Sequence, residues 1–368
     1  MSVPRWTVNW NNHSGSSCAG DAAGIPAATP KWESLKCAKW GAGNQVCAVE
    51  DAVYINSAGR ICVALNIETG KTMWDTEYPH PAIEQFCVGS KAVCVAPYVL
   101  HRDTGEIIAD LSSEDYEFGA VDDVLNDVFY VVVNAPEKGI LRIGEAGFEF
   151  FSIPAAGVTV FDNGKRVLGS EVPGRLVCYD VGSRKRLWAM PYGLSETGKF
   201  LGGMNSLQML FDDRVYQHLF IDTLRCIDVN TGNILWVSGP EKMGEAEYNK
   251  AKGPSRYLGC VDALYLGREC ISDGYLQARS AEDGRLLWRV DAPDARMFLT
   301  AGDLLFGAMD DVPAAWDRHT GEVVWRADKR MTAVSNAVAA GNKVIYSNTM
   351  SQMRCYEWDV AYVSTAWR

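Results

Sequence analysis

Side chains that could carry out catalysis are present in this sequence, but they are scattered along it. No two of the five histidines form a His-x-x-x-His or His-Glu-x-x-His pattern, which would place metal ligands on one helix face. The histidines are His13, His80, His101, His218 and His319. Adjacent carboxylates lie near turn residues, which indicates solvated side chains rather than an acid–base pair. These pairs are Asp122-Asp123, Asp212-Asp213 and Asp310-Asp311.

Nucleophile and phosphate-binding motifs are also missing from the sequence. No Gly-x-Ser-x-Gly elbow occurs, and no Gly-rich loop follows a strand and opens a helix. The eleven cysteines include neither an adjacent pair nor a Cys-x-x-Cys motif. Cys62, Cys94, Cys178 and Cys226 fall in apolar runs, where a free Cys acts as a small buried hydrophobe. We therefore expect no catalytic, cofactor-binding or metal-binding residues and no disulfide framework.

Composition and charge narrow the classes of partner. The 368 residues are 48% hydrophobic, enough for a sizeable core, and the net charge is -11. A nucleic-acid backbone or an anionic membrane attracts basic surfaces, so we expect neither as the main partner. No window approaches the ~20 apolar residues that span a bilayer. Residues 1–10 lack the apolar segment of a secretory signal, which predicts a cytoplasmic protein.

The elements that would position any functional group belong to an internal repeat. Each copy begins with a small residue, and an Asp, Asn or Ser follows two positions later. A tight turn comes next, and a Trp lies eight positions after the Asp, Asn or Ser. Copies occupy residues 64–74, 178–188, 226–236, 278–288 and 315–325. Gly supplies the positive φ of such a turn, and an Asp or Asn ahead of it can accept hydrogen bonds from the turn backbone. A repeated supersecondary unit determines the architecture.

The repeat returns roughly every 40 residues from Gln45 onward, a period typical of β-propellers. A short β-rich run marks the second strand of each of eight units. These runs begin at Ala52, Ala92, Val128, Arg166, Arg214, Ala263, Leu304 and Lys343. We predict an all-β, eight-bladed β-propeller of four-stranded antiparallel blades over residues 44–368. Residues 1–43 form an irregular N-terminal arm.

The outline small-x-Asp-x-x-Thr-Gly-x-x-x-Trp resembles the repeat of the pyrroloquinoline-quinone (PQQ) type β-propellers. The resemblance implies that the repeat covers the third strand, the turn and the outer strand, and that the Trp docks between neighbouring blades. Six Trp residues at matched positions then read as packing residues: Trp74, Trp188, Trp236, Trp288, Trp325 and Trp367. The second copy places Ala109 at the Trp position, the third keeps only Gly147 and Phe151, and the last keeps Asp359 and Trp367.

Closure of the ring is left open by the sequence. Trp367 fits the outer strand of the eighth blade, so that the C-terminus completes its own unit. Alternatively, residues 6–10 are added to that sheet as a closing strand. Either arrangement leaves only short strand edges exposed.

Candidate partner-binding residues lie where the rhythm of the repeat breaks. Two long insertions, residues 190–205 and 239–257, follow the outer strands of adjacent blades and therefore share one face. Together they can form a raised surface that binds a partner. The hypothesis that they are only tolerated surface insertions is given equal weight. The N-terminal arm carries several large aromatic residues that dock on the protein's own rim or on a partner. The candidates are Trp6, Trp10, Trp32, Trp40, Tyr192, Lys199, Lys242, Tyr248 and Tyr257.

Three functional readings follow. The first is a non-enzymatic scaffold that binds protein partners, including as a structural component of a larger assembly such as a virion. The second, implied by the resemblance, is a PQQ-dependent alcohol or sugar dehydrogenase, although no quinone site is identifiable. The third is a propeller similar to the outer-membrane assembly protein, a periplasmic lipoprotein, for which the signal and the lipidation Cys are missing.

Overall fold

The structure of the chain is a computed structural model. It describes residues 23–34, 44–125, 127–162, 164–171, 174–191, 194–195, 208–211, 213–220, 223–239, 242–243, 256–259, 262–268, 273–350 and 352–364. Among these residues there are eight four-stranded antiparallel sheets and one two-stranded parallel sheet, with no helix that could cross a membrane. The protein is therefore all-β.

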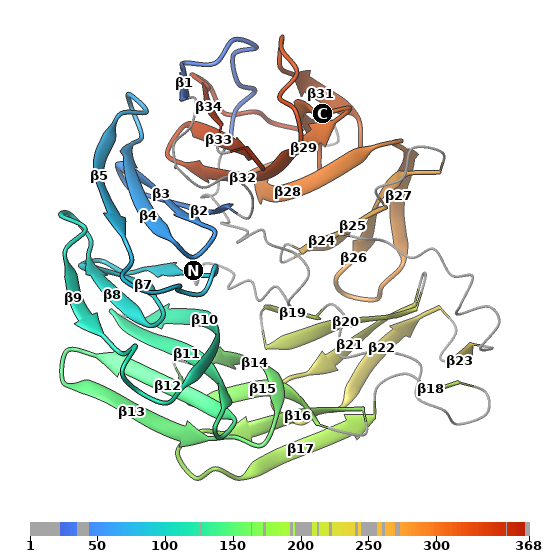
Figure 1. Cartoon of the computed structure of the whole chain (residues 1–368). Coiled ribbons are helices and arrows are strands. Elements are labelled where there is room, and N and C mark those ends of the chain that lie inside the picture. Colours follow the sequence, from blue (N-terminus) through green and yellow to red (C-terminus); the bar gives the residue numbers. More distant parts are fainter. Residues whose placement is uncertain are drawn as a thin grey trace.

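The eight sheets are arranged as blades around a common axis (Figure 1). Blade 1 contains β2 (Asn44–Val49), β3 (Ala52–Ser57), β4 (Ile61–Asn66) and β5 (Thr72–Glu77), and blade 2 contains β6 (Cys87–Val88), β7 (Ala92–Val95), β8 (Tyr98–His101) and β9 (Ile107–Asp110). Blade 3 contains β10 (Glu117–Leu125), β11 (Val128–Ala135), β12 (Gly139–Gly144) and β13 (Gly147–Ser152), and blade 4 contains β14 (Ala156–Phe161), β15 (Arg166–Glu171), β16 (Arg175–Asp180) and β17 (Arg186–Pro191).

Blades 5 to 8 complete the ring. Blade 5 contains β19 (Gln208–Phe211), β20 (Arg214–Phe220), β21 (Thr223–Asp228) and β22 (Ile234–Ser238), and blade 6 contains β24 (Arg256–Gly259), β25 (Ala263–Arg268), β26 (Tyr275–Ser280) and β27 (Leu286–Asp291). Blade 7 contains β28 (Ala295–Ala301), β29 (Leu304–Met309), β30 (Val312–Asp317) and β31 (Val323–Arg326), and blade 8 contains β32 (Val334–Ala340), β33 (Lys343–Asn348), β34 (Met353–Glu357) and β1 (Trp32–Ser34). All eight runs predicted to be second strands begin the second strand of a blade, and the predicted fold class is confirmed.

The turn between the third and fourth strands is held by the side chain that the repeat places ahead of it. In blade 1 the Asn66 side-chain oxygen accepts hydrogen bonds from the Glu68 and Thr69 N–H groups, at 3.1 and 3.0 Å. In blade 5 Asp228 does the same for Asn230 and Thr231, at 2.9 and 2.8 Å. The acceptor satisfies backbone donors that the turn leaves unpaired, as expected from the sequence.

In blades 1, 4, 5 and 6 the repeated Trp ties the blade to the next one. It lies directly opposite the small residue in the ladder, as in the pairs Ala64 with Trp74 and Cys226 with Trp236. The Trp74 indole N–H donates to the carbonyl of Arg102 in blade 2, at 2.9 Å. Trp188, Trp236 and Trp288 donate to the next blade in the same way, to Val229, Ala281 and Arg318. These Trp residues are packing residues between blades.

The eighth blade closes with a segment that neither sequence alternative named. Its outer strand is β1, three residues from the N-terminal arm, which pairs antiparallel with β34 (Figure 1). Trp32 lies opposite Cys355 and donates its indole N–H to the Ile67 carbonyl of blade 1, at 2.8 Å. Trp32 thus takes the position expected for Trp367, which lies outside the described residues together with residues 6–10.

The register predicted for the last copy is wrong for the same reason. β34 ends at Glu357, and Trp32 lies opposite Cys355, so Cys355 occupies the small position of the repeat. Glu357 then occupies the Asp position, two residues before the predicted Asp359. The following segment, residues 358–364, does not form an outer strand. It crosses to blade 7, where the Tyr362 hydroxyl donates to Asp317 at 2.8 Å. Local similarity at Asp359 was therefore accidental.

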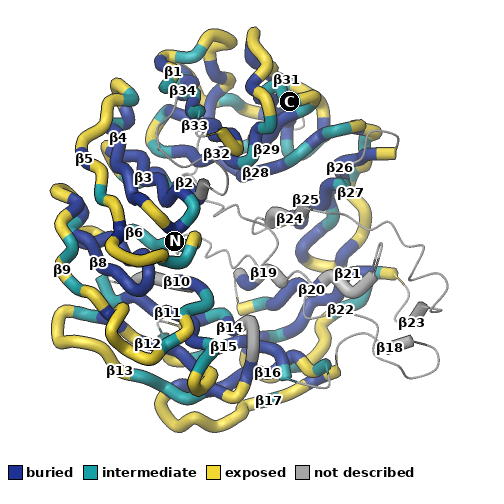
Figure 2. The backbone as a smooth tube through the Cα atoms, in the orientation of Figure 1, coloured by how far each residue is buried: buried dark blue, intermediate teal, exposed yellow. Residues whose placement is uncertain are grey.

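Most of the buried side chains lie on the three inner strands of the blades, and the outer strands are mainly exposed (Figure 2). The four cysteines expected to be core residues, Cys62, Cys94, Cys178 and Cys226, are fully buried and free of disulfides. Three internal seams depart from the Trp pattern. Blades 2 and 3 have Ala109 and Phe151 at the Trp position, and the third such seam lies between blades 7 and 8. Because blade 8 lacks the Thr-Gly turn, the Trp325 indole N–H has no acceptor among the described residues and packs edge-on against Tyr356.

Candidate interaction surface

The two insertions meet outside the ring of blades. In the first insertion, β18 (Leu194–Ser195) pairs in parallel with β23 (Lys242–Met243) of the second. The register places Leu194 beside Lys242 and Ser195 beside Met243. Figure 1 shows the two strands at the periphery, beyond the outer strands of blades 4 and 5. We call β18 and β23 with the segments that carry them the insertion pair; the predicted adjacency of the two insertions is confirmed.

A buried arginine from the next blade anchors the base of the first insertion. Arg225 is 5% exposed, and its guanidinium donates to the Pro191 carbonyl, the last residue of β17, at 2.8 Å. The same guanidinium donates to the Gln217 side-chain oxygen, at 2.8 Å from Nε. Hydrogen bonds from a charged, desolvated group are stronger than neutral ones, so the chain leaves blade 4 in a fixed direction.

The second insertion has an equivalent anchor. Arg279 of blade 6 donates to the Ser238 hydroxyl at 3.0 Å and to the Gly284 carbonyl at 3.1 Å. Gly239 follows with a φ of 99°, a conformation that favours Gly and turns the chain away from β22. Both arginines lie on third strands whose other residues are mostly buried. An Arg at such a position is the sequence signal that could have pointed to them, and neither was predicted from the sequence.

The predicted partner-binding residues separate into four groups. Lys242 lies in β23 of the insertion pair. Tyr257 does not belong to the insertion, because it lies in β24, the inner strand of blade 6, opposite Leu266. Trp32 is 9% exposed and is committed to ring closure, so it is unavailable to a partner. The remaining candidates lie outside the described residues: Trp6, Trp10, Trp40, Tyr192, Lys199 and Tyr248.

His319 and Asp303, two residues that could do chemistry, have structural partners. His319 contacts Asp303 at 3.0 Å, and the same carboxylate accepts the Ser364 N–H at 3.0 Å. Burial raises the pKa of Asp303, but these hydrogen bonds outweigh it and the pKa lies below its ordinary value. Asp303 therefore remains ionised and fastens the C-terminal segment to blade 7.

The Asp310-Asp311 pair was expected to be solvated, and this is wrong for Asp311. Its side chain is 15% exposed and lies 3.3 Å from both Arg296 and Arg330. Asp310 lies 3.7 Å from Arg326. Both residues have positive φ values, 52° and 58°, which identify a turn. No cluster of three or more His, Cys, Asp or Glu side chains with metal-binding geometry occurs within the described residues.

Comparison with known proteins supports the resemblance seen in the repeat. A family model described as outer membrane protein assembly factor BamB matches residues 272–368, which include the last two strands of blade 6, all of blade 7 and three strands of blade 8. This match confirms the resemblance to the PQQ-type repeat in that part of the chain. No curated protein matches the sequence.

Solved structures agree with the fold along nearly the whole chain. The crystal structure of BamB from Moraxella catarrhalis is 15% identical with a TM-score of 0.63, covering 91% of this chain and 99% of that one. The computationally designed Ika8 protein is 13% identical with a TM-score of 0.64, covering 92% and 100%. At such identities the likeness shows the eight-bladed fold. A fold shared with a designed protein does not specify one activity.

Proposed function

We propose that this chain is a non-enzymatic scaffold that binds a protein partner through the insertion pair. The observation that carries the proposal is the β18–β23 ladder, which joins two insertions from adjacent blades at the periphery of the ring. Independent surface insertions have no reason to be hydrogen-bonded to one another. A ladder between two insertions with anchored bases lowers the entropic cost of ordering them for a partner, relative to two separate loops.

The nature of the partner follows from the fold and from the family comparison. The matched family is described as an outer membrane protein assembly factor, which makes a protein partner in a multi-subunit assembly the first expectation for this chain. A virion is one such assembly. We propose a cytoplasmic protein whose net charge of -11 disfavours nucleic acid and anionic membranes as main partners.

Cross-linking in material purified from the source tests the proposal. The full chain is compared with a variant in which residues 192–206 and 240–254 are each replaced by Gly-Ser-Gly. We expect a partner to be retained by the wild type, with cross-links at Lys242, and lost from the variant. Lys242→Ala is expected to lose the cross-links at that position. Lys329→Ala, a substitution of an exposed Lys in the connection between blades 7 and 8, is its matched control.

Two results would contradict the proposal. One is retention of the same partner by the shortened but folded variant. The other is a monomer without any co-purifying protein. The dehydrogenase alternative is tested by adding PQQ and calcium and measuring dye-linked oxidation of alcohols and sugars. Sustained turnover in that assay would overturn the non-enzymatic assignment.

A further inference from the structure

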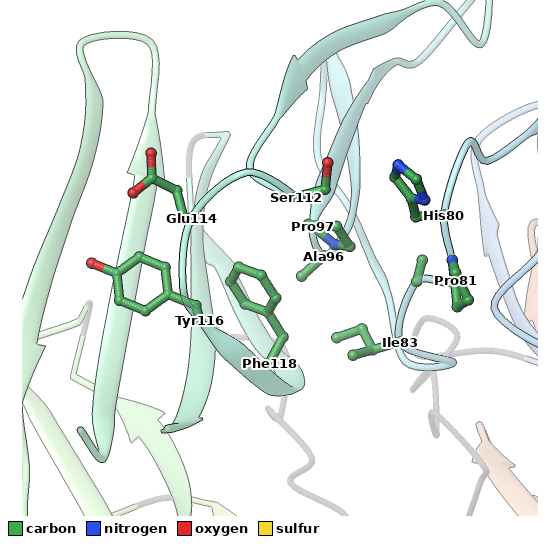
Figure 3. A pocket seen from close by; sticks show the side chains of 10 residues that line it. His80, Pro81, Ile83, Ala96, Pro97, Ser112, Glu114, Tyr116 and Phe118 are labelled. Carbon is green, nitrogen blue, oxygen red and sulfur yellow. The ribbon is translucent and has the colours of Figure 1, made fainter. Parts of the chain in front are cut away.

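A cavity of about 450 Å³ opens beside blade 2, away from the insertion pair. One wall is the connection from β5 to β6, residues 80–83. The other is the connection from β9 to β10, with Tyr116, together with Phe118 at the start of β10 (Figure 3). Ala96 and Pro97, at the turn between β7 and β8, form its floor. Both walls are connections from an outer to an inner strand, as the two insertions are. The cavity therefore opens on the same face of the ring as the insertion pair.

The wall from residues 80–83 is held rigidly. The Asn56 amide is fully buried and donates to the carbonyls of Ile83 and Glu84, at 2.8 and 2.7 Å. The His80 N–H donates to the buried Tyr98 hydroxyl at 3.0 Å. A buried side-chain amide that bonds two consecutive carbonyls fixes a loop without a regular strand. This wall is therefore formed before any ligand arrives.

The opposite wall is also fixed. The Asp110 carboxylate accepts the Ser112 N–H at 2.8 Å, and the Leu111 N–H donates to Pro97 at 3.0 Å. The ring of Tyr116 lies 5.9 Å from that of Phe118 in an edge arrangement and stacks on Phe150 at 5.6 Å. Tyr116 and Phe118 are half-buried, so part of each ring remains accessible from the cavity.

Charge around the cavity has one sign. The connections that form the two walls, residues 78–86 and 111–116, contain three Asp and Glu and no Lys or Arg. Glu114 lines the cavity, Glu84 and Asp115 adjoin lining residues, and all three are exposed. The described structure gives none of them an ion pair with Lys or Arg. Hydrogen bonds from Ser112 lower the pKa of Asp110, so that group also stays ionised.

We propose that this cavity binds a basic side chain, Arg in preference to Lys, from an exposed segment of a partner protein. The cation lies over the rings of Tyr116 and Phe118 and faces Glu114, and an apolar neighbour contacts Pro97 and Ile83. A guanidinium stacks on aromatic faces while its edge donates to a carboxylate, which matches this combination of walls. The surrounding negative potential steers a basic segment toward the site and repels an acidic one.

The full chain is titrated with three fluorescein-labelled peptides that differ only at the centre: Gly-Pro-Leu-X-Leu-Pro-Gly, with X as Arg, Gln or Glu. The Arg peptide is expected to bind saturably, at least about tenfold more tightly than the Gln peptide, and the Glu peptide not to bind. Its affinity falls as salt rises from 50 to 300 mM, because the site is acidic and exposed. Fluorescence anisotropy measures all three.

Variants locate the binding. Two variants are each expected to weaken binding of the Arg peptide about tenfold: the double variant Glu114→Gln with Asp115→Asn, and the single variant Phe118→Leu. The double variant is expected to keep the melting temperature of the wild type. Glu106→Gln, which removes an exposed carboxylate from a Thr-Gly turn, is the matched control and is expected to have no effect. The inference is overturned by equal binding of the Arg and Gln peptides, by no binding of the Arg peptide, or by a loss of binding in the control equal to that in the cavity variants. Loss of binding only when the insertion pair is shortened would also overturn it.

Discussion

The indole N–H of Trp32 donates a 2.8 Å hydrogen bond to the backbone carbonyl of Ile67, and this bond closes the ring. Trp32 lies in the outer strand of blade 8, while Ile67 follows the third strand of blade 1. Trp74, Trp188, Trp236 and Trp288 make the same bond between consecutive blades. The closing seam therefore uses the same packing as the internal seams, although its strand comes from the other end of the chain.

Removing the closing Trp should destabilise the whole ring. Trp32→Ala is expected to cost about 3–5 kcal/mol, because it empties a buried aromatic site. Trp32→Phe is expected to cost about 1–2 kcal/mol, since it keeps most of the ring and loses the hydrogen bond to Ile67. Chemical denaturation measures both. Val360→Ser, at a 77% exposed site, is the control; equal losses in all three variants would contradict the role of Trp32.

Gly70 is expected to tolerate no side chain, because a Cβ there would lie 2.6 Å from the Trp32 ring and its φ is +68°. Gly70→Ala should cost more than the ~1–2 kcal/mol of left-handed backbone strain alone. Gly341→Ala isolates that strain, since Gly341 has a φ of +57° and nothing within 4 Å of its Cβ position. Similar unfolding free energies for the two variants would show that the contact with Trp32 is unimportant.

Acid is expected to weaken the closing strand through Glu68. Hydrogen bonds from Lys31 and Lys343 lower the pKa of Glu68 from 4.5 to about 2. Because the folded pKa lies below the ordinary one, this stabilisation is present above pH 4.5 and is lost as the pH falls toward 2. The stability difference between the wild type and Glu68→Gln should therefore shrink over that window. A difference that stays constant from pH 6 to 2.5 would contradict the assignment.

Cys355 should report opening of the closing seam. It is fully buried opposite Trp32, and burial raises the pKa of its thiol to about 12. Iodoacetamide reacts with the thiolate, so labelling of the native protein should be slow. In Trp32→Ala we expect labelling of Cys355 to be at least about tenfold faster, as followed by peptide mass spectrometry. Cys94, buried in blade 2, should keep its native rate; equal acceleration there would indicate global unfolding.

Arg225 is expected to hold the insertion pair in place. Arg225→Met keeps the apolar stem but loses the bond to the Pro191 carbonyl, which should cost about 1.5–3 kcal/mol and expose the insertions to protease. Arg225→Lys should recover only part of the loss, because Lys lacks the planar fork that reaches Pro191 and Gln217 together. Arg184→Ala, at an exposed turn, is the control. Unchanged proteolysis in Arg225→Met would contradict the anchoring role.

Much of the fold was predictable because its signals are local. In blades 1, 5 and 7 the turn combines an Asp or Asn with a Gly four residues later, and each Trp lies opposite a small residue in the adjacent strand. A repeat of eleven residues therefore contains most of the information for one hairpin. The adjacency of the insertions was predictable as well, because consecutive blades are neighbours. The cavity beside blade 2 was not predictable, because its walls and floor come from three different connections whose sequences carry no motif.

The sequence by itself determined eight blade units, their strands and the absence of any recognisable catalytic motif. Only the tertiary structure decided how the ring closes. The closing strand is three residues long, and its partner strand, β34, lies more than 300 positions away, so no periodicity connects Trp32 with Cys355. Two groups that need a partner select this strand. One is the edge of β34, which β1 pairs, and the other is the Ile67 carbonyl of blade 1, in the place where blades 2, 5, 6 and 7 receive a Trp.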